Sequence, residues 1–419
     1  MRNLSSRAVA AQIIARWLAT GDFPNRILNS APPSGAFVTE VVQGVVRWKR
    51  FLEWVIRQHV KSMPPPSLKS ILLTGLYQIL IMQNEADYAA VNETVKLTKS
   101  DFSKKQTDFV NAVLRRCAAE RDSIAKAANK LPPGIRHSHP DLLLKRWTKA
   151  RGAKATLRLC AWNNTRPDVF IKINLLRSPG LVRSFAAQLK RRGVLPSANF
   201  DGYFLLPRGL RIEDLPGYAE GMFLVIAPFA ANAIDLLAPR PDENILDSCA
   251  APGGKTFLIA EKMRFSGKLQ AFDVSEDRIL IMKTNFQRLQ ISDFAAIKKQ
   301  NILGPMPADN RKYDRILADV PCSNTGVIRR KPDVRWRFSL NGLNLIVKTQ
   351  TKMLDRLAPL LKPGGTLVYS TCSLEPEENR GQITKWLAKH PDFRLAGERS
   401  FFPPDSGTDG GYAAAITRR

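Results

Sequence analysis

The stretch LDSCAAPGGKTFLIAEK, Leu246 to Lys262, decides the fold of this chain. A short apolar run ends in Asp247 and leads through a Gly-Gly turn into an amphipathic segment, which is the pattern of a buried strand followed by a helix. Backbone amides at the start of such a helix point toward a ligand. A Walker loop would need glycine where Cys249 stands, and a G-x-G-x-x-G fingerprint does not occur here. A turn with a purely structural role remains the alternative.

The same alternation of short apolar runs and helical segments continues from about residue 228 to the end of the chain. The runs are bounded by Gly, Pro and Asp, as in ENILDSCA, GKLQAFDVS, YDRILADVP and GGTLVYSTCS. Such alternation predicts a Rossmann-like α/β domain over residues 228–419, with a parallel sheet covered by helices on both faces. Ligands of these sheets bind at the carboxyl ends of the strands.

Asp273 ends the apolar run that follows this helix, 19 residues after Gly254. An acidic residue at about this spacing hydrogen-bonds ribose hydroxyls in nucleotide-binding sheets. Together with a turn that matches no diphosphate motif, Asp273 favours an adenosine cofactor without a diphosphate, and S-adenosylmethionine fits. Capping of the next helix, ahead of SEDRI, is a compatible second role for Asp273.

The part of the chain before residue 228 has a different pattern. Up to about residue 126, apolar residues recur every three to four positions, which predicts an all-α bundle, and the Pro-rich stretch NKLPPGIRHSHP ends it. We expect a helical domain over residues 1–138. Residues 139–227 read as basic linker helices followed by a small α/β module, which we interpret as an RRM-like RNA-binding module.

The formal net charge of +27 indicates a polyanionic partner. The charge is densest in residues 141–227, so we expect phosphate contacts there. The segment VIRRKPDVRW, Val327 to Trp336, supplies a second candidate RNA contact, and a solvated loop is its alternative. The cationic candidates in this segment are Arg329, Arg330, Lys331 and Arg335.

The remaining composition indicates a soluble cytosolic protein, and we expect a monomer. The N-terminus lacks the unbroken apolar stretch of a signal peptide, and the longest apolar segment, residues 71–82, is too short to cross a membrane. The five cysteines form no Cys-x-x-Cys pair, so we expect reduced thiols and no metal site.

Two of these cysteines, Cys322 and Cys372, each follow an apolar run at the predicted ligand-binding edge of the sheet. A buried structural thiol is the usual role of one such cysteine, but two at one edge suggest chemistry on cytosine. A thiolate that adds to C6 makes C5 nucleophilic toward a methyl donor, and a second group can help to release the product. We expect Cys372 to attack, because a helix predicted directly after it would lower the thiol pKa.

Asp319 lies three residues before Cys322. Its carboxylate could hydrogen-bond the N3/N4 edge of the base and stabilise the adduct as charge develops. Capping of the turn after the strand is an equally good interpretation of this residue from the sequence.

The motifs CAAPGGK, DRILADVPCSNTGVIRR and YSTCSLEPEEN together resemble the RNA cytosine-C5 methyltransferases of the NOL/NOP/Sun family. In the N-terminal part, ADYAAVNETVKLTKS and FVNAVLRR resemble the RNA-binding NusB fold, which points to the branch that methylates 16S ribosomal RNA. SGTDGGYAAAITRR resembles the family's C-terminal strand pair. The resemblance implies that Cys372 is the nucleophile and that Cys322 assists product release. It implies a cofactor site made of Cys249, Ala250, Ala251, Pro252, Gly253, Gly254, Lys255, Asp273 and Asp319.

The chain departs from the family pattern at two positions. Asn301 stands where the family commonly has Asp, so its amide would have to contact the adenine without a charge. Lys172 stands where Arg is usual, which removes bidentate binding of an RNA phosphate. Rival hypotheses are a non-catalytic RNA-binding or antitermination factor, and a methyltransferase for transfer RNA or DNA. In the DNA enzymes Cys322 would be the attacking thiol.

Overall fold

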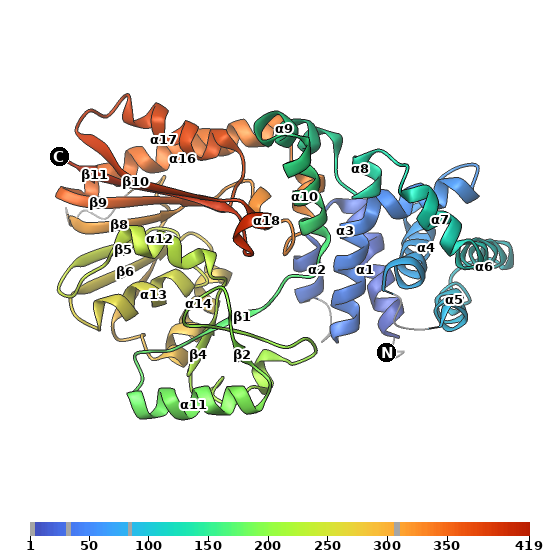
Figure 1. The fold of residues 1–419 in the computed structure, drawn as a ribbon, viewed down its shortest axis with the longest axis horizontal. Coiled ribbons are helices and arrows are strands. Elements are labelled where there is room, and N and C mark those ends of the chain that lie inside the picture. Colours follow the sequence, from blue (N-terminus) through green and yellow to red (C-terminus); the bar gives the residue numbers. More distant parts are fainter. Residues whose placement is uncertain (1–4, 31–34, 83–85, 306–310) are drawn as a thin grey trace. The chain divides into compact units, whose positions relative to one another are not determined.

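The computed structural model describes residues 5–30, 35–82, 86–305 and 311–419. The chain divides into two compact units (Figure 1). Unit 1 joins Met1–Thr165 with Lys331–Arg337, and unit 2 joins Arg166–Arg330 with Phe338–Arg419. The boundaries therefore differ from those expected at residues 138 and 227. The basic linker helices belong to unit 1, the small α/β module belongs to unit 2, and a short segment from the middle of the catalytic sequence belongs to unit 1.

Unit 1 is helical, as the apolar spacing predicts. Its helices begin at ordinary caps: the Ser5 hydroxyl accepts a hydrogen bond from Ala8 N, and Ser103 forms a capping box with Gln106. The elements of unit 1 are α1 (Ser6–Thr20), α2 (Pro24–Ser30), α3 (Ala36–His59), α4 (Pro66–Tyr77), the π-turn η1 (Gln78–Met82), α5 (Asp87–Lys96), α6 (Lys104–Ala119), α7 (Arg121–Ala128), α8 (Pro133–Arg136), α9 (Asp141–Arg151), α10 (Ala153–Asn164) and α15 (Val334–Arg337).

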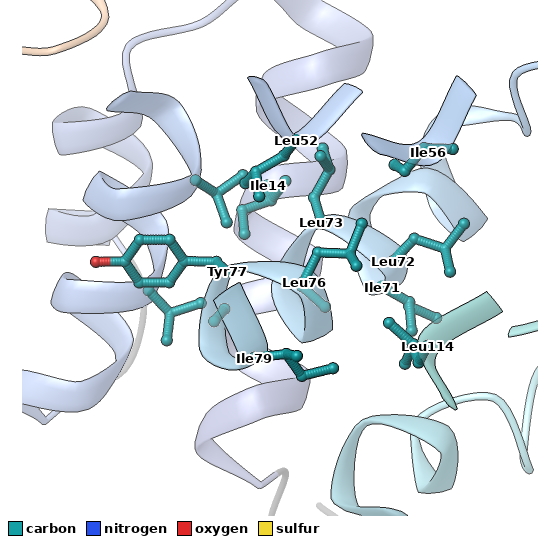
Figure 2. Close-up of a cluster of buried hydrophobic side chains, with 14 of the residues drawn as sticks. Ile14, Leu52, Ile56, Ile71, Leu72, Leu73, Leu76, Tyr77, Ile79 and Leu114 are labelled. Carbon is teal, nitrogen blue, oxygen red and sulfur yellow. The ribbon is translucent and has the colours of Figure 1, made fainter. Parts of the chain in front are cut away.

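Helix α4 supplies the centre of the unit 1 core. Figure 2 shows its leucines Leu72, Leu73 and Leu76 among apolar side chains of α1, α3 and α6, and all of these residues are buried. Burial of each such side chain contributes roughly 1.5–3 kcal/mol to folding, so this core is large enough to make the helical unit stable.

Unit 2 begins with a small antiparallel sheet in the order β2-β3-β1-β4. One face is covered by α11 through a core that includes Ile171, Phe185 and Phe223. Strands β1 and β3, with helix α11 between them, form the predicted small α/β module, and the segment between β3 and β4 holds the 3-10 turn η2. The elements are β1 (Phe170–Ile173), α11 (Pro179–Arg191), β2 (Leu195–Pro196), β3 (Tyr203–Leu205), η2 (Ile212–Asp214) and β4 (Phe223–Val225).

The opposite face of this small sheet contacts the larger domain. Lys172 and Leu224 are paired across β1 and β4. The Lys172 ammonium lies 2.6 Å from a carboxylate oxygen of Glu261 in helix α13 (Gly254–Met263), and Leu224 packs in the same apolar cluster as Phe257 of that helix. An RRM-like module would offer this face to RNA. The RRM-like interpretation therefore stays a prediction, and part of the face that it requires is covered.

The larger sheet has the order β10-β11-β9-β8-β5-β6-β7, parallel except for the antiparallel C-terminal pair β10 and β11. One of its two apolar clusters includes residues of α12, α13 and α14, and the other includes residues of α16 and α17, so helices cover both faces, as predicted (Figure 1). The remaining elements are α12 (Phe229–Leu237), β5 (Asn244–Asp247), β6 (Lys268–Asp273), α14 (Glu276–Leu289), β7 (Ala295–Lys299), β8 (Tyr313–Asp319), η3 (Thr325–Val327), α16 (Leu340–Leu357), η4 (Ala358–Leu360), β9 (Leu361–Thr371), η5 (Pro376–Glu378), α17 (Arg380–Leu387), β10 (Phe393–Phe401), α18 (Pro403–Ser406) and β11 (Gly411–Arg418).

Strands β8 and β9 are adjacent and parallel, with Asp319 paired with Ser370. Their carboxyl ends therefore lie at one edge of the sheet, and the two cysteines that follow them are brought to that edge. Within the described ranges, no helix is long and apolar enough to cross a membrane.

Candidate active site

The loop between β5 and α13 folds back on itself and onto β6. The Ala250 amide donates to the Phe272 carbonyl at 2.8 Å, and the Gly253 amide donates to the Ala250 carbonyl at 2.8 Å. Gly253 has φ +101°, and a Cβ atom there would lie 2.5 Å from the Phe286 ring, so only glycine fits this turn. The bond between Ala251 and Pro252 is cis. Because the amides of Ala250, Ala251 and Gly253 all have partners within the protein, the first turn of α13 is the source of amide donors for a ligand.

Asp273 is buried and holds this loop in place. Its carboxylate accepts hydrogen bonds from Ala251 N at 3.1 Å and Ser275 N at 3.0 Å. The hydroxyl of Ser275, not the carboxylate of Asp273, caps α14 by accepting from Arg278 N. Asp273 thus lies beside the predicted cofactor loop, and its contact with ribose hydroxyls stays a prediction.

Asn301 is exposed and follows the end of β7, the strand next to β6 in the sheet. Its side-chain oxygen accepts a hydrogen bond from Leu303 N at 3.0 Å. A contact with an adenine amino group would use the second lone pair of this oxygen, and this predicted contact also remains open.

Asp247 is a buried carboxylate at the end of β5. One oxygen accepts a hydrogen bond from the Thr256 hydroxyl at 2.7 Å, and the other has no partner within the described part of the chain. Burial raises the pKa of Asp247 to about 7, against the opposing hydrogen bond from Thr256. An unsatisfied buried oxygen beside a glycine turn fits a cofactor that brings hydrogen-bond donors, as the ammonium group of S-adenosylmethionine does.

Asp319 forms an ion pair with Lys255, in which the ammonium lies 2.5 Å from a carboxylate oxygen. The predicted alternative, a cap of the turn after the strand, is not the contact that this carboxylate makes. Burial lowers the pKa of Lys255, but the charge of Asp319 and its hydrogen bond outweigh burial, and the net pKa is raised. Lys255 therefore carries a positive charge next to the end of β8. The charge of Cys372 also contributes to raising the pKa of Lys255, so this ammonium lies within electrostatic reach of the thiol.

The two cysteines at the edge of the sheet lie side by side, with 3.2 Å between the sulfur atoms of Cys322 and Cys372. The Cys372 sulfur is also 3.2 Å from the side-chain oxygen of Asn324, which adopts a left-handed backbone conformation with φ +59°. The hydrogen bond with Cys372, followed by burial, raises the pKa of Cys322 well above that of a free thiol. The Cys322 thiol is therefore a weaker acid than a free thiol.

The other cysteines have different surroundings. Burial raises the pKa of Cys249, in the cofactor loop, to about 12, which makes it a poor nucleophile. Cys117 and Cys160 are buried in unit 1.

The helix expected directly after Cys372 starts later than predicted. The chain first forms the 3-10 turn η5, and α17 begins only at Arg380. The prediction that a helix N-terminus adjoins Cys372 is therefore wrong. The charged group that the structure provides near this thiol is Lys255.

Glu378, in η5, is a buried residue of this edge that the sequence analysis did not single out. It accepts hydrogen bonds from both segments that carry the thiols. In the sequence, Glu378 ends the acidic run EPEE after Cys372, which lies within the helix predicted there.

The predicted RNA contacts largely have internal partners. Arg335 is 0 % exposed, and its guanidinium donates to the carbonyls of Arg47, Ser138 and Asn163 in unit 1. The prediction that Arg335 contacts RNA is therefore wrong. The Trp336 indole, in the same segment, donates to the Val46 carbonyl.

The other predicted RNA-binding cations differ in their exposure and in their partners. Arg329 is nearly buried and pairs with Asp168 at 2.9 Å. Arg330 pairs with Asp409 at 2.7 Å, and Lys172 is held by Glu261. Of the predicted RNA-binding cations, only Lys331 is exposed.

A mostly parallel seven-stranded sheet, with a glycine turn and an acidic residue after neighbouring strands, defines a methyltransferase of the class that uses S-adenosylmethionine. Comparisons with known proteins identify the family within this class. The family described as "16S rRNA methyltransferase RsmB/F" matches residues 234–416, and the NusB family matches residues 4–119.

Two curated relatives match along most of the chain. One is named "Probable ribosomal RNA small subunit methyltransferase B" and comes from Synechocystis sp.; it is 36% identical over 87% of this chain and 83% of its own length. The other, "Ribosomal RNA small subunit methyltransferase B" of Vibrio cholerae, is 32% identical over 99% of this chain and 98% of its own. The crystal structure of PH0851 has a TM-score of 0.81, at 22% identity and over 99% of each chain, and shows the same fold.

This chain belongs to the RsmB/F family of 16S rRNA methyltransferases. The predicted NusB-like domain is confirmed, and so is the predicted methyl donor, S-adenosylmethionine.

Proposed function

We propose that this protein methylates C5 of a cytosine in 16S ribosomal RNA through a covalent bond between Cys372 and C6 of the base. The observation that carries the proposal is the 3.2 Å separation of two thiols at the edge of the sheet where the cofactor loop ends. A single structural cysteine would not need a second thiol in contact. S-adenosylmethionine, when bound, supplies an electrophilic methyl group.

The chain's own groups divide the work as follows. Cys372, as thiolate, adds to C6 of cytosine, which makes C5 nucleophilic. Lys255 stabilises negative charge near the thiol and fixes Asp319 by the 2.5 Å ion pair. After methyl transfer, C5 loses its proton to a base and the electron pair of that C–H bond restores the ring as the bond from Cys372 to C6 breaks. The Cys322 thiol, whose sulfur is 3.2 Å from that of Cys372, would protonate the departing Cys372 sulfur.

The residues around the cofactor loop fit S-adenosylmethionine. Asp247 and the first turn of α13 would hold the amino acid end, Asp273 the ribose, and Asn301 the adenine. The target cytosine must be unpaired or flipped out of its stack to reach the two thiols. We place the reaction in the cytoplasm, where ribosomal RNA is the natural polyanion for a chain of net charge +27.

Nucleoside analysis of 16S rRNA treated with the protein and labelled S-adenosylmethionine tests this function. The expected product is 5-methylcytidine in 16S rRNA, with no transfer to 23S rRNA or transfer RNA. Label in another nucleoside, or preferential labelling of transfer RNA, would contradict the proposal. An unlabelled product despite binding of S-adenosylmethionine would also contradict it, and would favour a non-catalytic RNA-binding factor.

A further inference from the structure

Glu378 is fully buried against the turns that carry the two thiols, and both of its carboxylate oxygens accept hydrogen bonds. One oxygen accepts from the Ser323 amide at 2.8 Å and from the Gln350 side-chain amide at 3.1 Å. The other accepts from the hydroxyls of Ser323 and Ser373. Burying a carboxylate is costly unless it is hydrogen-bonded, so this arrangement is a specific structure and not a chance contact.

The two serines directly follow the two thiols in sequence: Ser323 comes after Cys322, and Ser373 after Cys372. Their hydroxyls lie 3.0 Å apart, and both donate to the same carboxylate oxygen of Glu378. One side chain therefore ties together two segments that are 50 residues apart in the chain.

The backbone of the same two segments is joined as well. The Gly326 amide donates to the Cys372 carbonyl at 2.9 Å, and a Cβ atom at residue 326 would lie 2.2 Å from the Gly410 carbonyl oxygen. The Thr325 hydroxyl accepts from Leu374 N at 2.9 Å. Within this frame, Glu378 is a charged group that binds both cysteine-bearing turns.

We infer that Glu378 is a positioning residue that sets the separation of the two thiols by holding Ser323 and Ser373 with one carboxylate. The inference rests on the proposed function, because it assigns the two thiols to one reaction. Glu378 touches neither sulfur; it acts through the serines. A displacement of about 1 Å between reacting groups can lower a rate by roughly a hundredfold, so loss of this anchor should reduce turnover.

The carboxylate also gives the two thiols different electrostatic surroundings. Burial raises the pKa of Glu378, while its hydrogen bonds from Ser323 and Ser373 oppose that shift. Its negative charge is one of the causes that raise the pKa of Cys322, after the hydrogen bond with Cys372 and burial. Glu378 thus favours the protonated form of Cys322, which is the form needed to release the product.

Two substitutions at residue 378 distinguish the effect of the hydrogen bonds, which position the two thiols, from the effect of the negative charge of Glu378. Glu378→Ala removes all of the hydrogen bonds. Glu378→Gln can keep them, because its amide oxygen can face the Ser323 amide and its NH2 group can donate to the serine hydroxyls. Glu213→Ala, in the exposed turn η2, is the control for loss of a carboxylate.

We expect Glu378→Ala to lower kcat at least about tenfold, with KM for S-adenosylmethionine within about twofold of wild type, and Glu378→Gln to recover most of the lost kcat. Glu213→Ala should match wild type. Equal turnover of Glu378→Ala and wild type would overturn the inference, and so would a Gln variant as slow as the Ala variant although folded by circular dichroism.

The charge effect has its own measurement, the pH dependence of iodoacetamide labelling at Cys322, followed by mass spectrometry. Glu378→Gln should shift the labelling curve of Cys322 to lower pH, since the negative charge that raises its pKa is gone. An unchanged or upward-shifted curve would contradict the inference. If wild-type protein itself does not methylate 16S rRNA, the proposed function fails, while the labelling experiment still tests the role of Glu378 by itself.

Discussion

Two segments that are neighbours in the sequence have opposite roles, although both contain catalytic or nucleic-acid-binding residue types. Residues 319–328 begin at the last residue of β8 and carry Asp319 and Cys322 at the edge of the sheet. Residues 331–337 hold a dense basic and aromatic cluster, yet they belong to unit 1 and bury Arg335 among backbone carbonyls. Nucleophiles at a strand end are placed by the sheet, whereas the exposure of a basic cluster depends on where tertiary contacts take it.

At the edge of the sheet that carries the thiols, we expect a large loss of turnover when Lys255 is substituted. Lys255→Met removes the ammonium that pairs with Asp319, and loss of one such electrostatic group typically lowers turnover by about a hundredfold or more. Lys262→Met, at an exposed position of the same helix, is the matched control and should retain wild-type turnover. Single-turnover transfer of labelled methyl to 16S rRNA measures both, and equal rates would remove Lys255 from the site.

In the segment 331–337, we expect a large loss of stability when Arg335 is substituted. Arg335→Ala leaves several buried carbonyls without a donor, and we expect unit 1 to lose roughly 3 kcal/mol of stability. Lys331→Ala, at the exposed start of the same segment, should change stability by less than about 0.5 kcal/mol. Thermal or urea unfolding of both variants decides this, and an Arg335→Ala variant as stable as Lys331→Ala would show that the segment is not an anchor.

Asp247 predicts a pH dependence of stability. Its folded pKa, about 7, lies above the unfolded value near 3.8, so the folded state binds the proton more tightly. Below pH 3.8 the Asp247 carboxyl is protonated in both states and does not lower the free energy of unfolding. As pH rises toward 7, the unfolded state releases this proton more readily, so the free energy of unfolding falls. Asp247→Asn should remove this loss, so its melting temperature should exceed that of wild type by several degrees at pH 8 and by less at pH 5. A difference that is the same at both pH values would contradict the raised pKa.

The smallest effect concerns RNA binding by the cationic residues. Lys331→Ala should weaken binding of 16S rRNA a few-fold and reduce the slope of log affinity against log salt by about one. Lys172→Ala should leave that slope unchanged, because Lys172 is paired with Glu261. Filter binding at several salt concentrations separates the two. A change of slope only in Lys172→Ala would reverse the assignment.

The sequence predicts most of the fold because its signals are local. The period of the apolar residues identified the helical unit, and strand–turn–helix patterns identified the parallel sheet and both cysteines at its edge. The extent of unit 1 was not predictable, because α9, α10 and residues 331–337 join it through contacts distant in sequence, such as those of Arg335 with Arg47.

Within the site, residues that end strands were predictable and residues that act through others were not. Asp273 and Asp319 are the last residues of their strands, so their position was visible in the pattern. Glu378 was missed because its role depends on two serines that come together only when β8 and β9 pair. The start of α17 at Arg380 was missed as well, because the 3-10 turn η5, which contains Glu378, comes before it.

The central claim, that two thiols share the making and breaking of one bond to cytosine, is tested most directly by mapping the covalent RNA adduct. Cys322→Ala should accumulate an adduct whose proteolytic peptide carries the nucleotide on Cys372, and Cys372→Ala should form no adduct and transfer no methyl group. An adduct on Cys322 in Cys372→Ala, or release of product from Cys322→Ala at the wild-type rate, would contradict the account.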